Sequence, residues 1–166
     1  MKNGSKWNYA AATMKAASDA GIGACKITGI VTAATAAAVI TDVHAWTLDA
    51  GAAGLLADYR DAALLLDEDL LMEAARQAMR ARQDILRPTA LVVQQDHLAM
   101  FQRYTWLAAQ HGICRAVFID AERARQWTQV QAQVFAQWPV MRRPASAESS
   151  RTGSAFSPVP TPSSPA

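Results

Sequence analysis

Between Lys26 and Trp138 the sequence alternates four times between a short apolar run and a longer stretch with helical spacing. The apolar runs are residues 25–31, 54–59, 89–93 and 115–120. Alternation of this kind is typical of α/β layer folds, in which helices cross over between neighbouring parallel strands. The sequence therefore predicts an α/β fold, with a small and mostly parallel sheet of four or five strands and about four helices packed on it.

Local signals mark the ends of these helices. Thr32, Asp96 and Asp120 stand where an N-cap is expected, because a side-chain oxygen there accepts a hydrogen bond from a free backbone N–H. Residues 67–69 give the second helix an acidic first turn, which complements the helix dipole, and a short connection over residues 62–66 leads into it. The predicted helices are therefore bounded by chemistry as well as by spacing.

Spacing of three and four residues predicts which face of each helix is buried. Trp106 falls outside the buried stripe of the third helix, so we expect it to be exposed or to cover a helix edge. The expected buried stripes are Ala36, Val39, Ile40, Val43 and Trp46 in the first helix, Leu71, Ala75, Ala78, Met79 and Ile85 in the second, Leu98, Phe101, Tyr104, Leu107 and Ala108 in the third, and Ala124, Trp127, Val130, Val134 and Trp138 in the fourth.

Composition divides the chain into three parts. Residues 1–23 are small, polar and alanine-rich, which predicts a weakly structured segment or an edge strand. Residues 24–139 carry the alternating pattern and form the single α/β domain. Residues 140–166 are rich in proline and serine, so we expect a disordered tail. Cys25 and Cys114 each lie at a predicted strand, and we expect two buried thiols without a disulfide or a zinc site.

Several classes of function are disfavoured by charge and motif. The formal net charge is only +2, without the clustered lysines and arginines of a nucleic-acid interface. The uncharged stretch 27–40 is too short and too threonine-rich to span a bilayer, and no secretory signal begins the chain, so a cytoplasmic location is expected. The sequence lacks glycine-rich phosphate loops and the GxSxG elbow, and no cofactor or metal is predicted.

The remaining candidates for chemistry lie at the carboxyl ends of the predicted strands, where ligands collect in open α/β sheets. Asp58 with Asp120 is a potential carboxylate pair for a divalent cation, with His97 as a nearby base. The alternative is structural: Asp96 and Asp120 cap helices, and Asp58 pairs with Arg60 or faces water. Both interpretations stay open at this stage.

Three stretches of the chain resemble the STAS family, the domains that include anti-sigma-factor antagonists, and especially its small bacterial STAS/SEC14-like members. Residues 55–62 resemble the central strand with its Asp-x-Arg ending, and Asp67-Glu68-Asp69-Leu70 resembles the acidic start of the following helix. Residues 90–127 resemble the closing strand-helix-strand-helix. The resemblance implies a STAS-like fold and a non-enzymatic regulatory or binding module.

One departure from that family concerns phosphorylation. Antagonists of the family carry a phosphorylatable Ser or Thr at the start of the helix after the central strand, whereas this chain has Asp67, Glu68 and Asp69 there. The resemblance therefore implies that partner switching by phosphorylation is not available at this position. We hypothesise that the permanent acidity of Asp67, Glu68 and Asp69 mimics the phosphorylated state.

The sequence thus predicts a bacterial, cytoplasmic module that binds a protein partner, self-associates, or binds a small apolar or anionic ligand. The alternative is a metal-dependent or small-molecule-binding α/β enzyme or switch that uses the carboxylates at the strand ends. The residues expected to contact a ligand or partner are Asp58, Arg60, Asp67, Glu68, Asp96, Trp106 and Asp120.

Overall fold

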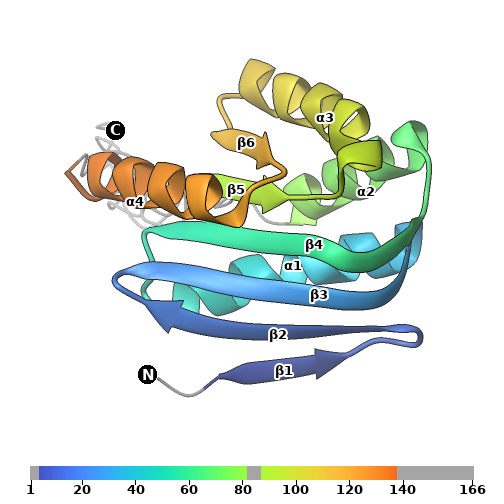
Figure 1. The fold of residues 1–166 in the computed structure, drawn as a ribbon, viewed down its shortest axis with the longest axis horizontal. Helices are drawn as coiled ribbons and strands as arrows, with labels where there is room; N and C mark the ends of the chain where they lie inside the picture. Colours follow the sequence, from blue (N-terminus) through green and yellow to red (C-terminus); the bar gives the residue numbers. More distant parts are fainter. Residues whose placement is uncertain (1–3, 82–86, 138–166) are drawn as a thin grey trace, which may run out of the picture.

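The computed structural model describes residues 4–81 and 87–137, which form a six-stranded sheet with four α-helices (Figure 1). The strands are β1 (Ser5–Asn8), β2 (Ala12–Asp19), β3 (Ile22–Thr32), β4 (Gly54–Leu65), β5 (Thr89–Val92) and β6 (Arg115–Phe118). The helices are α1 (Ala33–Asp49), α2 (Glu68–Ala81), α3 (Leu98–Gln110) and α4 (Ala121–Gln137), and a 3-10 turn, η1 (Gln95–His97), precedes α3. The predicted α/β class is confirmed.

The strands lie in the sheet in their order along the chain, from β1 to β6. The pairings β3–β4, β4–β5 and β5–β6 are parallel, whereas β1–β2 and β2–β3 are antiparallel. The sheet therefore has more strands than the four or five that the sequence predicts, because the amino-terminal segment contributes two strands and the start of β3.

The amino-terminal strands are held to the rest of the molecule by one face. Met14 of β2 is fully buried opposite Ile27 of β3. The indole ring of Trp7 packs edge-on against Trp46 of α1, at 6.4 Å between ring centroids. The Tyr9 hydroxyl donates a 2.9 Å hydrogen bond to an Asp42 carboxylate oxygen. Residues 5–8 and 12–19 are thus integral strands, where the sequence predicts a weakly structured segment or one edge strand.

Gly29 allows β3 to pass close to the turn between β1 and β2. Its φ is +88°, and a Cβ at this position would overlap the carbonyl oxygen of Ala11. The same carbonyl accepts a 2.7 Å hydrogen bond from the backbone N–H of Ile30. Because side chains other than glycine rarely adopt this conformation, the crossing depends on glycine at position 29.

The β4 strand is longer than the sequence predicts. Residues 62–66, predicted as a connection, largely continue the strand, because Gly29–Thr32 of β3 pair with Ala62–Leu65. The register shifts between Lys26 and Thr28, so that two residues of β4 oppose one of β3, which is the geometry of a β-bulge. Strand β4 therefore carries polar residues in its middle rather than at its end.

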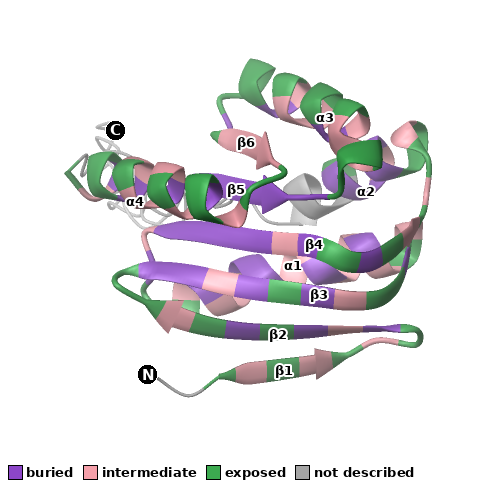
Figure 2. Cartoon of the chain, viewed as in Figure 1, coloured by how far each residue is buried: buried purple, intermediate pink, exposed green. Residues whose placement is uncertain are grey.

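The two faces of the sheet are covered differently. Helices α1, α2 and α3 pack on one face, and α4 packs alone on the other, over β4, β5 and β6 (Figure 1). The larger core lies on the first face and includes Met14, Ile27, Val39, Leu55 and Phe101. A smaller cluster lies between the second face and α4, and consists of Leu56, Ala90 and Val92 from the sheet and Ala124 from the helix. Figure 2 shows buried residues concentrated in β4 and β5, the strands covered on both sides.

The buried stripe of α4 differs from the predicted one. Ala124 is buried as predicted and Trp127 partly so, but Val130 and Val134 are 56% and 47% exposed. Thr128, Ala132 and Phe135 are buried in their place. Small residues are needed on this face because α4 lies close to the sheet: a Cβ on Gly54 would approach Thr128 and Ala132 to 3.1 Å.

In the other helices the predicted stripes agree with burial at Ala36, Val39, Val43, Leu71, Ala75, Phe101 and Ala108. Ile40, Trp46, Leu98, Tyr104 and Leu107 are half-buried. The side chains of Ala78 and Met79, and residues Ile85, Trp138 and 140–166, lie outside the described part of the chain. Cys25 is a buried free thiol as predicted, but Cys114 is an exposed free thiol, because it lies in the turn before β6.

Two of the three predicted helix caps are confirmed. Thr32 Oγ1 accepts from the backbone N–H of Thr35 at 3.3 Å, and Asp120 Oδ1 accepts from that of Arg123 at 2.7 Å. Asp96 was expected to cap the third helix and does not, because the chain first forms η1, where no side chain caps the turn. Among residues 4–81 and 87–137, no helix is long and apolar enough to cross a membrane.

Candidate functional site

The start of α2 is tied to the outer side of α3 by an ion pair. Arg103 Nη1 donates to both carboxylate oxygens of Glu68, at 2.8 and 3.0 Å. The Arg103 side chain is 74% exposed and that of Glu68 is 37% exposed. The pair is therefore a surface feature, whose contribution to stability is expected to be small.

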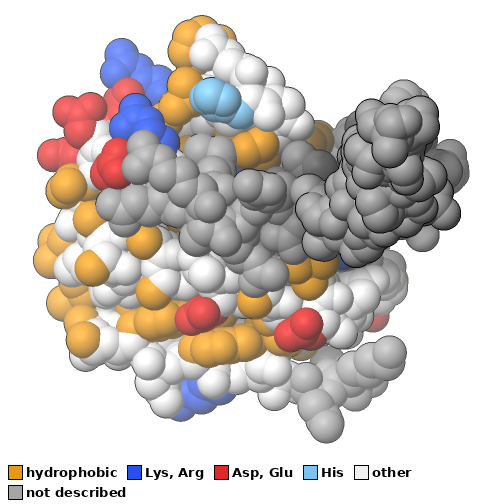
Figure 3. Space-filling model, turned by 180° about the vertical axis from the view of Figure 1, so that it is seen from behind, with side chains coloured by type: hydrophobic (Ala, Val, Ile, Leu, Met, Phe, Trp, Pro, Cys, Tyr) orange, Lys and Arg blue, Asp and Glu red, His pale blue; other side chains and the backbone are white. Residues whose placement is uncertain are grey.

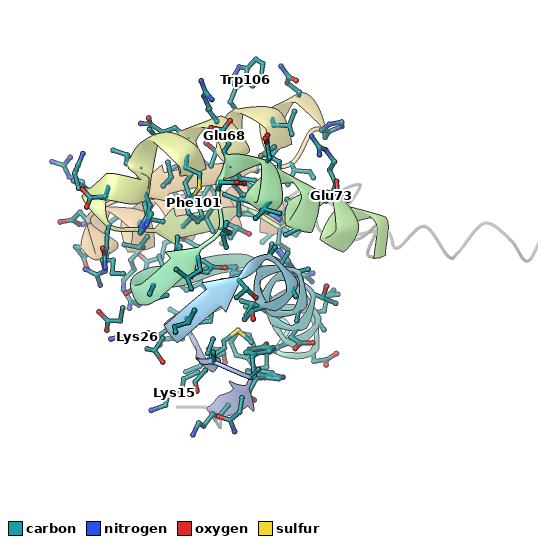
Figure 4. The ribbon with its side chains drawn as sticks, turned by 90° about the vertical axis from the view of Figure 1, so that its right-hand side faces the viewer. Lys15, Lys26, Glu68, Glu73, Phe101 and Trp106 are labelled. Atoms are coloured by element: carbon teal, nitrogen blue, oxygen red, sulfur yellow. The ribbon has the colours of Figure 1, made fainter. Side chains whose placement is uncertain are left out.

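Trp106 lies one helical turn after Arg103 and is 66% exposed, which is one of the two positions that the sequence leaves open. Figure 4 shows Trp106 projecting outward from α3, with Glu68 nearby and Phe101 of the same helix directed inward. Phe101 is buried against Tyr59, at 5.9 Å between ring centroids. Glu68, Arg103 and Trp106 together form what we call the α2–α3 surface.

The acidic residues that precede this surface have separate roles. Asp67 Oδ1 accepts a 2.9 Å hydrogen bond from the backbone N–H of Leu70, so Asp67 is the N-cap of α2. Asp69 is exposed. Of the three acidic residues at this helix start, Glu68 alone forms an ion pair with another helix within the described chain. Glu68 is therefore the one best placed to affect the α2–α3 surface.

A second polar cluster lies in the middle of β4. Arg60 Nη2 donates to Asp58 Oδ2 at 2.7 Å, and Arg60 Nε and its backbone N–H both donate to Asp58 Oδ1 at 3.0 Å. Gln94 Nε2 donates to the carbonyl of Arg60 at 2.6 Å. Partial burial acts to raise the pKa of Asp58, but the hydrogen bonds and charge of Arg60 outweigh it, and the pKa lies below its usual value.

The β-bulge brings one further carboxylate to this cluster. Asp61 forms an ion pair with Lys26 of β3. The hydrogen bond to Asp58 raises the pKa of Arg60, and the negative charges of Asp58, Asp61 and Asp120 raise it further. The cluster is therefore a network of paired charges in which each carboxylate of β4 already has a cationic partner.

This pairing bears on the carboxylate site considered from the sequence. Asp58 accepts three hydrogen bonds from Arg60, and Asp120 caps α4. Within residues 4–81 and 87–137, no group of three or more His, Cys, Asp or Glu side chains is arranged to hold a metal ion. His97 lies at the end of η1 and Asp96 is exposed beside it.

The structure thus divides the predicted contact residues into two groups. Glu68 and Trp106 lie on the α2–α3 surface, with Asp67 as the cap beside them, whereas Asp58, Arg60 and Asp120 lie on the α4 side of the sheet. Sequence reasoning missed Arg103 as the link between Glu68 and Trp106. The available signal was its position three residues before Trp106, since residues at this spacing share a helix face.

Comparison with known proteins yields a match in fold only. No family model and no curated protein matches the sequence. An anti-sigma factor antagonist from Mycobacterium paratuberculosis has a similar structure, with a TM-score of 0.50 and 13% sequence identity over 71% of this chain and 94% of that chain. An uncharacterized protein from the DUF3478 family of Shewanella loihica, with a SpoIIAA-like fold, has a TM-score of 0.48 and 17% identity over 74% of this chain and 97% of that chain.

Proposed function

We propose that this chain, which has the fold of an anti-sigma factor antagonist, is a non-enzymatic regulatory module that binds another protein through the α2–α3 surface. We further propose that the chain binds this partner in the bacterial cytoplasm. The observation that carries it is the exposure of Trp106 on a helix whose other aromatic residues are buried or half-buried.

An exposed tryptophan next to a charged pair is a favourable arrangement for binding a protein. Tryptophan and arginine are enriched among the residues that dominate binding energy at protein interfaces. The indole ring of Trp106 offers apolar area, while Glu68 and Arg103 beside it hold each other in a fixed geometry. A partner that covers Trp106 would bury apolar surface without having to order a mobile charge.

The position of Glu68 supports a regulatory role that does not need a kinase. Its carboxylate is fixed to α3 by Arg103, and it occupies the helix start where antagonists of the STAS family carry a phosphorylatable hydroxyl. We therefore expect the α2–α3 surface to be held in one state, with the negative charge always present. This part of the proposal rests on the resemblance to that family.

The proposal is tested by placing a photo-crosslinking amino acid at position 106 and, as a matched control, at the exposed Val130 of α4. We expect a discrete partner to be captured in cells of the source organism from position 106 and not from position 130. Binding of the purified partner should then weaken by about tenfold or more in Trp106→Ala, since interface tryptophans often contribute 2 kcal/mol or more. Identical products from both positions would contradict the proposal.

Two further measurements separate the alternatives. Glu68→Ser should change the affinity of that partner if fixed acidity matters, and an unchanged affinity would remove this part of the proposal. Mg²⁺ or Ca²⁺ should leave the melting temperature unchanged if no ion binds, because only an ion that binds the folded state would raise it. A rise that is lost in Asp58→Asn would instead favour the metal-dependent switch.

A further inference from the structure

Three lysines form a row across the part of the sheet that α4 leaves uncovered. Lys6 of β1 lies opposite Lys15 of β2, and Lys15 lies opposite Lys26 of β3. Their side chains lie on the face of the sheet opposite the larger core, and all three are exposed. Figure 4 shows Lys15 and Lys26 projecting side by side from this face.

The placement of these lysines is selective. The chain has four lysines, and the three that fall within the described residues are those of the row. Like charges directly opposite each other on neighbouring strands destabilise a sheet. The row is therefore an arrangement that the fold tolerates rather than one that stabilises it.

Protection of a sheet edge accounts for only one member of the row. Lysine on an edge strand discourages pairing with another chain, and Lys6 is on the edge strand β1. Lys15 and Lys26, however, lie on strands that are paired on both sides. Their presence needs another explanation.

The row borders a groove between the open sheet face and the start of α4. The groove has a volume of about 760 Å³, within the range of small-molecule sites. Its floor contains the small or apolar side chains of Ala17, Ala24 and Leu56, and its wall is formed by Ala121 and Arg125. Small residues on the floor leave room for an apolar body above the sheet. The opposite surface of the molecule, seen in Figure 3, is mixed in charge and carries broad apolar areas.

The charges facing this groove are unequal. The lining includes the cations Lys6, Lys15, Lys26, Arg60 and Arg125, against the carboxylates of Asp58 and Glu122. Lys26 is paired with Asp61 and Arg60 with Asp58, and Arg125 lies 4.0 Å from Asp19. Within the described chain, Lys6 and Lys15 form no ion pair. Two neighbouring ammonium groups are thus available for a doubly charged anion.

We propose that this groove binds a phosphate monoester, whose phosphate lies between Lys6 and Lys15 and whose apolar body rests on Ala17, Ala24 and Leu56. Neighbouring strands lie about 4.8 Å apart, so two opposed lysines can reach one phosphate group. At neutral pH that group carries close to two negative charges, which matches the two unpaired lysines. The site is on the other side of the sheet from the α2–α3 surface and is independent of it.

The test uses hexyl phosphate as the probe, with hexanol and inorganic phosphate as partial probes, in titrations followed by backbone NMR shifts of the full chain. We expect hexyl phosphate to bind at least about tenfold more tightly than either partial probe, because only it carries both the charge and the apolar body. The shifts should lie in β1–β3 and at the start of α4, and should weaken with added salt. Equal affinity for hexyl phosphate and for either partial probe would overturn the proposal.

Variants locate the site. Lys15→Gln should lower the affinity for hexyl phosphate at least about tenfold, and Ala24→Leu should lower it by filling the groove. Arg76→Gln is the matched control, since it removes an exposed cation from α2 on the other side of the sheet and should leave the affinity unchanged. Because Lys15 and Arg76 are both exposed, neither change is expected to unfold the chain. Equal loss in Lys15→Gln and Arg76→Gln would show general charge attraction and overturn the assignment.

Discussion

The two faces of the sheet show how one set of strands can be buried on one side and left partly open on the other. The first face is covered by α1, α2 and α3 and holds the larger core. The second is covered by α4 alone, over β4–β6, and its uncovered part carries Lys6, Lys15 and Lys26. Lysine side chains thus project from the part of this face that no helix covers.

The topology explains this difference. Each of α1, α2 and α3 connects two parallel strands that are adjacent in the sheet, and the strands advance in one direction from β3 to β6. Because such crossovers are almost always right-handed, helices between strands that advance in one direction lie on the same face. The hairpins from β1 to β3 have no crossover helix. Only α4, which follows the last strand, is left to cover the second face.

The largest expected effect contrasts two neighbouring residues on β3. Ile27 is fully buried in the larger core, whereas Lys26 points to the uncovered face. Ile27→Ala should lower the free energy of unfolding by about 2–5 kcal/mol because it leaves a cavity. Lys26→Ala should leave it nearly unchanged, because its ion pair is exposed. Urea denaturation measures both, and similar losses would show that the faces do not differ as described.

The next contrast compares two alanines on the α4 side of the sheet. Ala124 of α4 is fully buried against the sheet, and Ala17 is exposed on β2. Ala124→Leu should destabilise the protein by about 1–3 kcal/mol through overpacking. Ala17→Leu should stay within about 0.5 kcal/mol, because nothing covers it. A large loss in Ala17→Leu, seen as a lowered urea midpoint, would mean that this half of the face is covered in solution.

The smallest effect concerns Asp58, at the border of the covered and uncovered parts. Because its pKa is lowered in the folded state, it stabilises the protein above its unfolded pKa of about 3.9, and this contribution is lost as the pH falls through the lower folded pKa. Asp58→Asn should therefore be less stable than the parent at neutral pH, by about 1 kcal/mol or less. The difference should shrink in unfolding experiments below about pH 4. A difference that grew on acidification would contradict the lowered pKa.

Local signals in the sequence were sufficient for the parallel half of the fold. The strands predicted at 89–93 and 115–120 correspond to β5 and β6, and Thr32 and Asp120 cap helices through contacts within three residues. The position of Trp106 outside the buried stripe of α3 also followed from helical spacing alone. Each of these features depends on neighbours close along the chain.

Features that depend on distant neighbours could not be predicted in this way. In α4, Trp127, Val130 and Val134 formed the more apolar stripe, but the small residues face the sheet because Gly54 allows a close approach. The lysine row was missed for a related reason. Its members are nine and eleven residues apart and become neighbours only when β1–β3 pair in register.

The confinement of every lysine to the first 26 residues has a practical consequence for work with this protein. Reagents that couple to primary amines will attach at this end of the chain, and at Lys6, Lys15 and Lys26 they will attach to a single side of the molecule. A sensor surface prepared by amine coupling would leave Trp106 facing the solution while obstructing the groove beside α4. The same preparation would therefore report a protein partner and conceal a phosphate ester.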